Sequence, residues 1–147
     1  MKPSEAIQAL NRLLRTLCRS LPMYLADAKP WVRSEDAKLQ AAMCHLVSDQ
    51  QMYAKRLAEA IERRGGRPDP GRFPTEFTAK NDLSLDFLLS ELVDYQEQSV
   101  FTIQQCAAQL EDSSSLHSLA EEILGNAKGH LDILKEMSKT EIKMSKE

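Results

Sequence analysis

The chain carries four stretches in which apolar residues recur three and four positions apart, the spacing that turns one face of an α-helix toward a partner. They cover residues 4–28, 34–64, 84–111 and 116–137. Serine stands at or shortly before the start of each stretch, where its hydroxyl caps a helix well. The second stretch shows the pattern most clearly, with apolar positions at Leu39, Met43, Leu46, Leu57 and Ala60. The pattern predicts four helices.

The breaks between these stretches predict how the helices connect. Pro22 lies inside the first stretch and predicts a kink or a division into two pieces. Gly65-Gly66 ends the second stretch, and residues 68–71 (PDPG) form the strongest breaker cluster. The second helix is about 39 Å long at ~1.5 Å per residue. The roughly 17 residues that follow can extend about 55 Å. This link can therefore run back along the bundle and place the third helix parallel to the second.

These elements predict an all-α fold, a four-helix bundle of two up-down pairs with a long crossover between helices 2 and 3. The chain has 147 residues, which fits one domain. We assign residues 1–137 to the bundle. Residues 138–147 alternate charges with few apolar positions, which predicts a charged C-terminal tail that is frayed or disordered.

Charge and cysteine content narrow the class of protein. The net charge is −3 and the pI is near 5.7, so the chain lacks a broad basic field and we expect no nucleic-acid partner. No run approaches the ~20 apolar residues of a membrane span, and the amino terminus is too polar for a signal-peptide core. We expect a cytoplasmic protein without membrane contact. Each of Cys18, Cys44 and Cys106 lies among apolar neighbours, which predicts buried, reduced thiols.

Polar residues interrupt the apolar seams near the middle of the helices. Because the seams have matching lengths, their centres should fall at a similar height in the bundle. Buried polar groups left unpaired cost about 1–3 kcal/mol each, so we expect these side chains to hydrogen-bond to one another or to a buried water. The predicted polar layer consists of Gln50, Tyr53, Gln96, Ser99 and His130, facing Leu17 of the first helix.

With these residues the chain resembles the ferritin-like superfamily, which includes bacterioferritins and rubrerythrins. The resemblance spans residues 7–137 and rests on the long crossover, the double glycine, and residue pairs three apart on the second and fourth helices. The stretch LAEAIERRGGRPDP looks most similar to small stress-associated bacterial members with no established enzyme activity.

In that superfamily, one Glu from each of the first and third helices and a Glu-x-x-His pair from each of the other two hold two irons. Of the matching positions only His130 keeps the expected residue, and two irons need carboxylates both as donors and to neutralise charge. The resemblance therefore implies the fold without its usual di-iron oxidase chemistry, and we expect no cofactor. The six matching positions are Leu17, Gln50, Tyr53, Gln96, Ala127 and His130.

Two other groupings have the one-turn spacing that binds transition metals when two helices face each other. His45 and Asp49 lie on the second helix, and Glu122, Asn126 and His130 lie on the fourth. His45 and Asp49 flank the apolar seam, so we expect both on a solvated or helix-contacting face. No nucleophile motif and no glycine-rich phosphate loop accompany them.

The first functional hypothesis is a non-enzymatic interaction or structural module, with a stress-related role suggested by the resemblance. We expect a homodimer, because four apolar residues lie off the core seam of the third helix and would leave an apolar face in water. They are Leu88, Val93, Val100 and Phe101.

Two alternatives stay open. One is a metalloprotein with a single atypical site, formed by His130 with Tyr53 and water or by His45 with Asp49. The other is a small-molecule pocket in the polar layer, because Ala127 stands where the superfamily has a large ligand and leaves a void.

Overall fold

The computed structural model of the protein describes residues 1–28, 37–80 and 85–145. Within these residues it contains five α-helices, one 3-10 helix and no strand, which confirms the all-α prediction. None of these helices is long and apolar enough to cross a membrane. The predicted caps Ser34 and Ser84 lie outside the described residues. The elements are α1 (Pro3–Cys18), α2 (Leu21–Ala28), α3 (Ala37–Arg63), η2 (Thr75–Lys80), α4 (Leu85–Gln109) and α5 (Ser114–Ser145).

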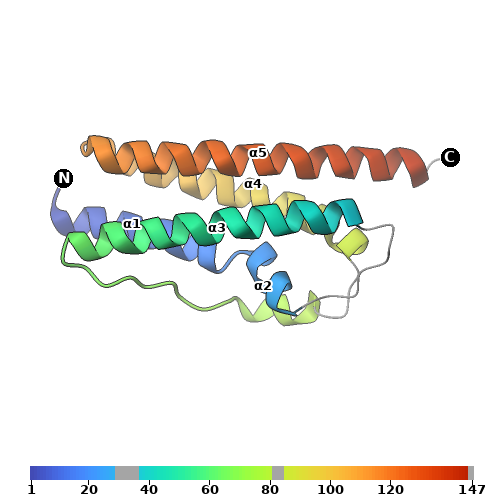
Figure 1. Cartoon of the computed structure of the whole chain (residues 1–147), viewed down its shortest axis with the longest axis horizontal. Helices are drawn as coiled ribbons and strands as arrows, with labels where there is room; N and C mark the ends of the chain where they lie inside the picture. Colours follow the sequence, from blue (N-terminus) through green and yellow to red (C-terminus); the bar gives the residue numbers. More distant parts are fainter. Residues whose placement is uncertain (29–36, 81–84, 146–147) are drawn as a thin grey trace.

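The four long helices form a bundle (Figure 1). Helix α1 packs against α3 and α4, and α5 packs against α4 and α3. Figure 1 shows α1 and α3 running in opposite directions, after which the chain returns along the bundle and α4 starts at the end where α3 started. Helices α3 and α4 are therefore parallel, and α5 is antiparallel to α4. The predicted course, two up-down pairs joined by a long crossover, is confirmed.

The first predicted helix is divided into α1 and α2. The α1 helix ends at Cys18 and α2 begins at Leu21. The Ser20 hydroxyl accepts a hydrogen bond of 3.2 Å from the Met23 backbone N–H, so Ser20 caps α2. Pro22 then lies in the first turn of α2, where a helix needs no backbone donor. Pro22 predicted either a kink or a division of the first helix, and the structure shows the division.

The double glycine ends α3 as predicted. The Gly66 N–H donates to the Ile61 carbonyl and the Gly65 N–H to the Glu62 carbonyl, both at 3.0 Å, which is the pattern of a glycine helix stop. Gly65 has a φ of 76°, where a side chain would be strained. A Cβ on Gly66 would lie 2.9 Å from the Ile7 side chain. The second glycine therefore lets the end of α3 approach α1 closely.

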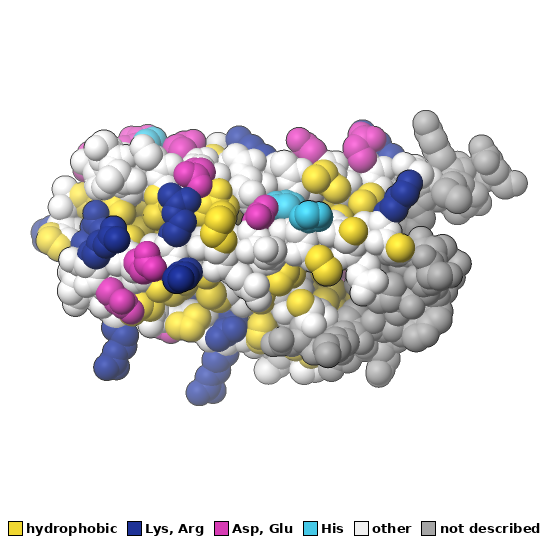
Figure 2. All heavy atoms as spheres, in the orientation of Figure 1, with side chains coloured by type: hydrophobic (Ala, Val, Ile, Leu, Met, Phe, Trp, Pro, Cys, Tyr) yellow, Lys and Arg dark blue, Asp and Glu magenta, His cyan; other side chains and the backbone are white. Residues whose placement is uncertain are grey.

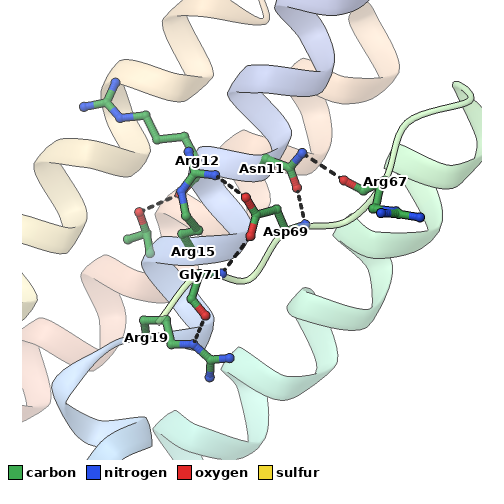
Figure 3. Close-up of polar contacts among 8 residues, drawn as sticks. Asn11, Arg12, Arg15, Arg19, Arg67, Asp69 and Gly71 are labelled. Atoms are coloured by element: carbon green, nitrogen blue, oxygen red, sulfur yellow. Dashed lines mark hydrogen bonds and ion pairs between the residues drawn. The ribbon is translucent and has the colours of Figure 1, made fainter. Parts of the chain in front are cut away.

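The first half of the crossover is hydrogen-bonded to α1 (Figure 3). Asn11 accepts a hydrogen bond of 2.8 Å from the Asp69 N–H and donates one of 3.2 Å to the Arg67 carbonyl. At the end of α1, the Arg19 Nε donates to the Gly71 carbonyl at 2.8 Å. These bonds, from Asn11 within α1 and from Arg19 at its end, hold the crossover along α1 and so direct it back toward the start of α3.

The second half of the crossover packs through the aromatic side chains of Phe73 and Phe77. Phe77 is fully buried. Its ring centroid lies 5.6 Å from that of Tyr24 in α2 and 5.3 Å from that of Tyr95 in α4. Phe73 lies 5.3 Å from Tyr24 in an edge-to-face arrangement. This cluster covers one end of the bundle with α2 and the crossover.

Beyond Ser138, where we predicted a frayed or disordered tail, the described residues continue α5 as a helix to Ser145. No Gly or Pro follows Gly129 to end the helix, and the Thr140 hydroxyl bonds to the Glu136 carbonyl at 3.0 Å. The division into a bundle of residues 1–137 and a tail of residues 138–147 stays a prediction.

The three cysteines are free, but they differ in exposure. Cys106 is buried, Cys18 is half-buried and Cys44 is exposed. Burial raises the pKa of the Cys106 and Cys18 thiols. The prediction of three buried thiols is therefore wrong for Cys44, which lies on the outer face of α3 beside the exposed His45.

Candidate functional site

A small cavity lies in the middle of the bundle, between two apolar clusters. One cluster joins α1 to the adjoining parts of α3, α4 and α5. The other joins α2, the first turns of α3 and α4, and Phe77. The cavity has a volume of about 10 Å³, close to the least space that holds one water molecule. Its lining includes all five residues of the predicted polar layer, Gln50, Tyr53, Gln96, Ser99 and His130, together with Leu17 and Ala127.

Four residues of this layer make hydrogen bonds between helices, but not with one another. In each case the partner stands on an adjoining helix or at the α1–α2 junction, so the predicted pairing within the layer is wrong for these bonds. The bonds are Ser20 Oγ to Gln50 Oε1 (2.8 Å), Tyr53 Oη to Glu122 Oε2 (2.8 Å), Gln96 Nε2 to the Ala127 carbonyl (3.1 Å), and His130 Nε2 with Asp49 Oδ2 (2.7 Å).

The carboxylate of Asp49 joins α3 to α5. Its Oδ2 atom accepts a hydrogen bond of 2.9 Å from Asn126 Nδ2 and lies 2.7 Å from His130 Nε2. The Asp49 side chain is 36% exposed and the His130 side chain 11%. The hydrogen bond from Asn126, followed by that with His130, lowers the pKa of Asp49, although partial burial raises it. Histidine and acidic side chains meet midway along the face drawn in Figure 2.

A second pair of contacts joins the same two helices one turn further on. Glu122 Oε2 accepts hydrogen bonds from Tyr53 Oη at 2.8 Å and from Arg56 Nη1 at 2.6 Å. Burial, followed by the bond to Glu122, raises the pKa of Tyr53 to about 12. The bond from Arg56 and then that from Tyr53 lower the pKa of Glu122. Tyr53 is therefore a neutral donor, and both carboxylates near the cavity already have partners.

The residues around the cavity do not fit two irons. Leu17 and Ala127 carry no donor atom, and Gln50 and Gln96 carry neutral amides where the superfamily has carboxylates. Two irons need anionic oxygen ligands, and the nearest ones, Asp49 and Glu122, are absent from the cavity lining. Within the described residues, no group of three or more His, Cys, Asp and Glu side chains has the geometry to hold a metal ion.

The structure brings together only some of the predicted metal candidates. Asp49 and His130 are in contact, whereas His45 is exposed. Of the two expected environments, a solvated face or a helix contact, His45 has the first and Asp49 the second, because α5 lies across that side of α3. Tyr53 and His130 both line the cavity, and the Tyr53 hydroxyl bonds to Glu122. The cavity beside Ala127 has room for a water and not for an organic molecule.

The sequence pattern missed two classes of partner. Ser20 is fully buried and donates a hydrogen bond to the Gln50 side chain. The sequence indicated it only through its position, two residues before Pro22 at a helix start. Glu122 and Asn126 were noticed for their spacing with His130, but not as partners of Tyr53 and Asp49. Both flank the α5 seam, and the seam alone does not define how α5 is rotated toward α3.

The apolar face predicted for dimerisation is partly covered by the fold. Leu88 is fully buried, and Val93 and Val100 pack against the two clusters. Helix α2 and the crossover cover part of α4, because the chain returns over that end of the bundle. Only Phe101 of the four stays exposed, at 61%. The predicted face is therefore wrong for Leu88, while Val93 and Val100 are partly buried.

The sequence matches no known protein family and no curated protein. The fold does match a solved structure, a ferritin-like, diiron-carboxylate protein from Bacillus anthracis str. Ames. The TM-score is 0.75 and the identity 20%, and the match covers 93% of this chain and 99% of the other. The chain therefore has the ferritin-like fold that the resemblance predicted.

Proposed function

We propose that this protein is a ferritin-like bundle without enzymatic activity, in which the central site is structural and the protein acts as an interaction or structural module. The single observation that carries the proposal is the lining of the central cavity. The six positions that the resemblance assigns to iron ligands converge there, and His130 alone among them has a usual metal-binding side chain.

The contacts around the cavity support a structural role for the polar layer. Gln50 joins α3 to the α1–α2 junction, Tyr53 and His130 join α3 to α5, and Gln96 joins α4 to α5. Each bond forms only at one relative height of the two helices, so together they favour a single register. The layer thereby fixes how the helices align. In metal-containing bundles, bound metal ions link the helices in a similar way.

Metal analysis tests this proposal. We expect protein purified without chelator, and then incubated with Fe(II) in air, to retain less than about one-tenth of a metal per chain. We also expect it to oxidise Fe(II) no faster than buffer. Stoichiometric metal, or oxidation of Fe(II) with turnover, would contradict the proposal.

The same analysis addresses the single-metal alternative. Asp49 and His130 stand on facing helices, 2.7 Å apart between Oδ2 and Nε2. A site there would bind about one Zn(II) or Co(II) per chain and would lose it in His130→Ala. The exposed His45→Ala serves as the matched control, because it removes an imidazole from α3 without touching the cavity. We expect neither variant to change the metal content.

The predicted homodimer is a separate part of the proposal and now rests on the exposed Phe101. Light scattering of the purified protein at micromolar concentration measures its mass in solution. A dimer that dissociates in Phe101→Ser supports this surface. A monomer under the same conditions removes the dimer and leaves the structural role of the polar layer intact.

A further inference from the structure

Gln96 is the one residue of the polar layer with a buried oxygen that lacks a hydrogen-bond partner among the described residues. Its side chain is 2% exposed and lines the central cavity. The amide Nε2 donates to the Ala127 carbonyl at 3.1 Å, which fixes the orientation of the amide group. The Oε1 atom is buried and has no donor in the described chain. Buried acceptors of this kind are rare, because desolvation without a hydrogen bond destabilises the folded state.

The cavity beside Gln96 limits what can supply the missing donor. Its volume of about 10 Å³ admits one water-sized molecule and no larger ligand. Its lining has six polar side chains, which exceeds the two to four partners that a buried water needs. Ser99 is among them, and a hydroxyl can both donate and accept. No carboxylate lines the cavity, so a cation placed there would lack anionic ligands.

We propose that this cavity is a binding site for a single water molecule, which donates a hydrogen bond to Gln96 Oε1 and bonds through its remaining sites to other polar groups of the lining. The bound water occupies the place where the superfamily holds metal. This inference rests on the proposed structural role of the layer and names the ligand that completes it. The water joins the polar groups of the layer that do not bond to one another directly.

A high-resolution crystal structure of the metal-free protein tests the proposal. We expect an oxygen-sized peak in the cavity, between about 2.6 and 3.2 Å from Gln96 Oε1. In solution, we expect the backbone amides nearest the cavity to show nuclear Overhauser effects to a long-lived water. A peak at about 2.0–2.4 Å from several lining atoms would be a metal ion and would overturn the proposal. A cavity closed by side chains would also overturn it.

Two glutamine variants identify the acceptor. Gln96→Met removes the buried oxygen, and we expect both the peak and the Overhauser effects to be lost. Gln98→Met changes an exposed glutamine of the same helix and should leave both signals unchanged. Persistence of the signals in Gln96→Met would overturn the role of Gln96. If Gln96→Met does not fold, the position of the peak in the unaltered protein decides the proposal alone.

The outcomes separate this inference from the proposed function. A metal-free protein with no water in the cavity would contradict only the water site. A protein that binds metal stoichiometrically in the cavity would contradict both.

Discussion

The charged residues beside the cavity lie at its edge, and each has a partner that suits its charge. Asp49 accepts from Asn126 and contacts His130, while Glu122 accepts from Tyr53 and Arg56. Both carboxylates have lowered pKa values for these reasons. Neutral amides and hydroxyls remain inside, where burial of a charge would be costly. The side chains therefore separate by charge, with anions at the rim and neutral polar groups at the centre.

This separation predicts that Asp49 contributes to the stability of the folded protein in a pH-dependent way. Its pKa in the folded protein lies below the ordinary value of 3.8, so the folded state favours the carboxylate. That stabilisation is complete above about pH 4 and is lost as the pH falls through the lowered pKa. We expect Asp49→Asn to reduce the free energy of unfolding at pH 7 by about 1 kcal/mol, less than a buried charged hydrogen bond contributes, because solvent screens this partly exposed side chain.

Urea unfolding at pH 7, 5, 4 and 3.5 measures this effect. The difference between Asp49→Asn and the unaltered protein should be smaller at pH 3.5 than at pH 5. Asp132→Asn, an exposed site on α5, should change stability by less than about 0.5 kcal/mol throughout. An undiminished difference at pH 3.5 would show that Asp49 acts through packing and not through its charge.

At the scale of elements, the start of α2, at its junction with α1, contributes directly to the central site. The Ser20 hydroxyl accepts from the Met23 N–H and donates its own proton to Gln50 Oε1. One fully buried side chain therefore caps α2 and satisfies a glutamine on α3. The break in the first helix is a structural feature that positions Gln50, and not merely a consequence of Pro22.

We expect Ser20→Ala to lower the free energy of unfolding by about 2 kcal/mol. The substitution removes an N-cap and leaves the buried side-chain oxygen of Gln50, Oε1, without a donor. The shift should appear as a lower urea midpoint with an unchanged slope. Ser118→Ala removes an exposed hydroxyl on α5 and serves as the control, with a change below about 0.5 kcal/mol. Equal effects of the two variants would contradict the role of Ser20.

At the scale of the whole molecule, the bundle brings six side chains from four helices to one cavity, in the positions that the resemblance predicts for iron ligands. We propose that the fold supplies the geometry of a central site, while the residues at these positions have a different chemistry. If so, restoring the superfamily's residue types should restore metal binding without any change in the helices.

A five-residue variant tests this reasoning: Leu17→Glu, Gln50→Glu, Tyr53→His, Gln96→Glu and Ala127→Glu. We expect it to be less stable than the unaltered protein without metal, because buried carboxylates repel one another. We expect Fe(II) or Mn(II) to raise its melting temperature and bind at about two ions per chain. Addition of His130→Ala should weaken this binding. A folded five-residue variant that binds no metal would show that the six positions do not form a ligand set.

The sequence predicted the fold more completely than the site, and particular residues explain why. The residues around the cavity follow from seam register, since Gln50, Gln96 and His130 each stand at the centre of a helix. Their partners do not follow from it. Long side chains such as those of Tyr53 and His130 reach beyond the seam, so residues that flank it, Glu122 and Asp49, become partners when two helices rotate toward each other.

The sequence by itself determined the helices, the double-glycine stop, the break near Pro22 and the crossover, because these depend on local backbone preferences and on apolar periodicity. It also determined which polar residues meet at the centre. Only the tertiary structure decided that α2 and the crossover cover α4 and bury Leu88, and that Asp49 and Glu122 face α5. The reason is physical. Periodicity defines which face of a helix is buried, whereas the partners of that face depend on how separate helices rotate and pack against one another.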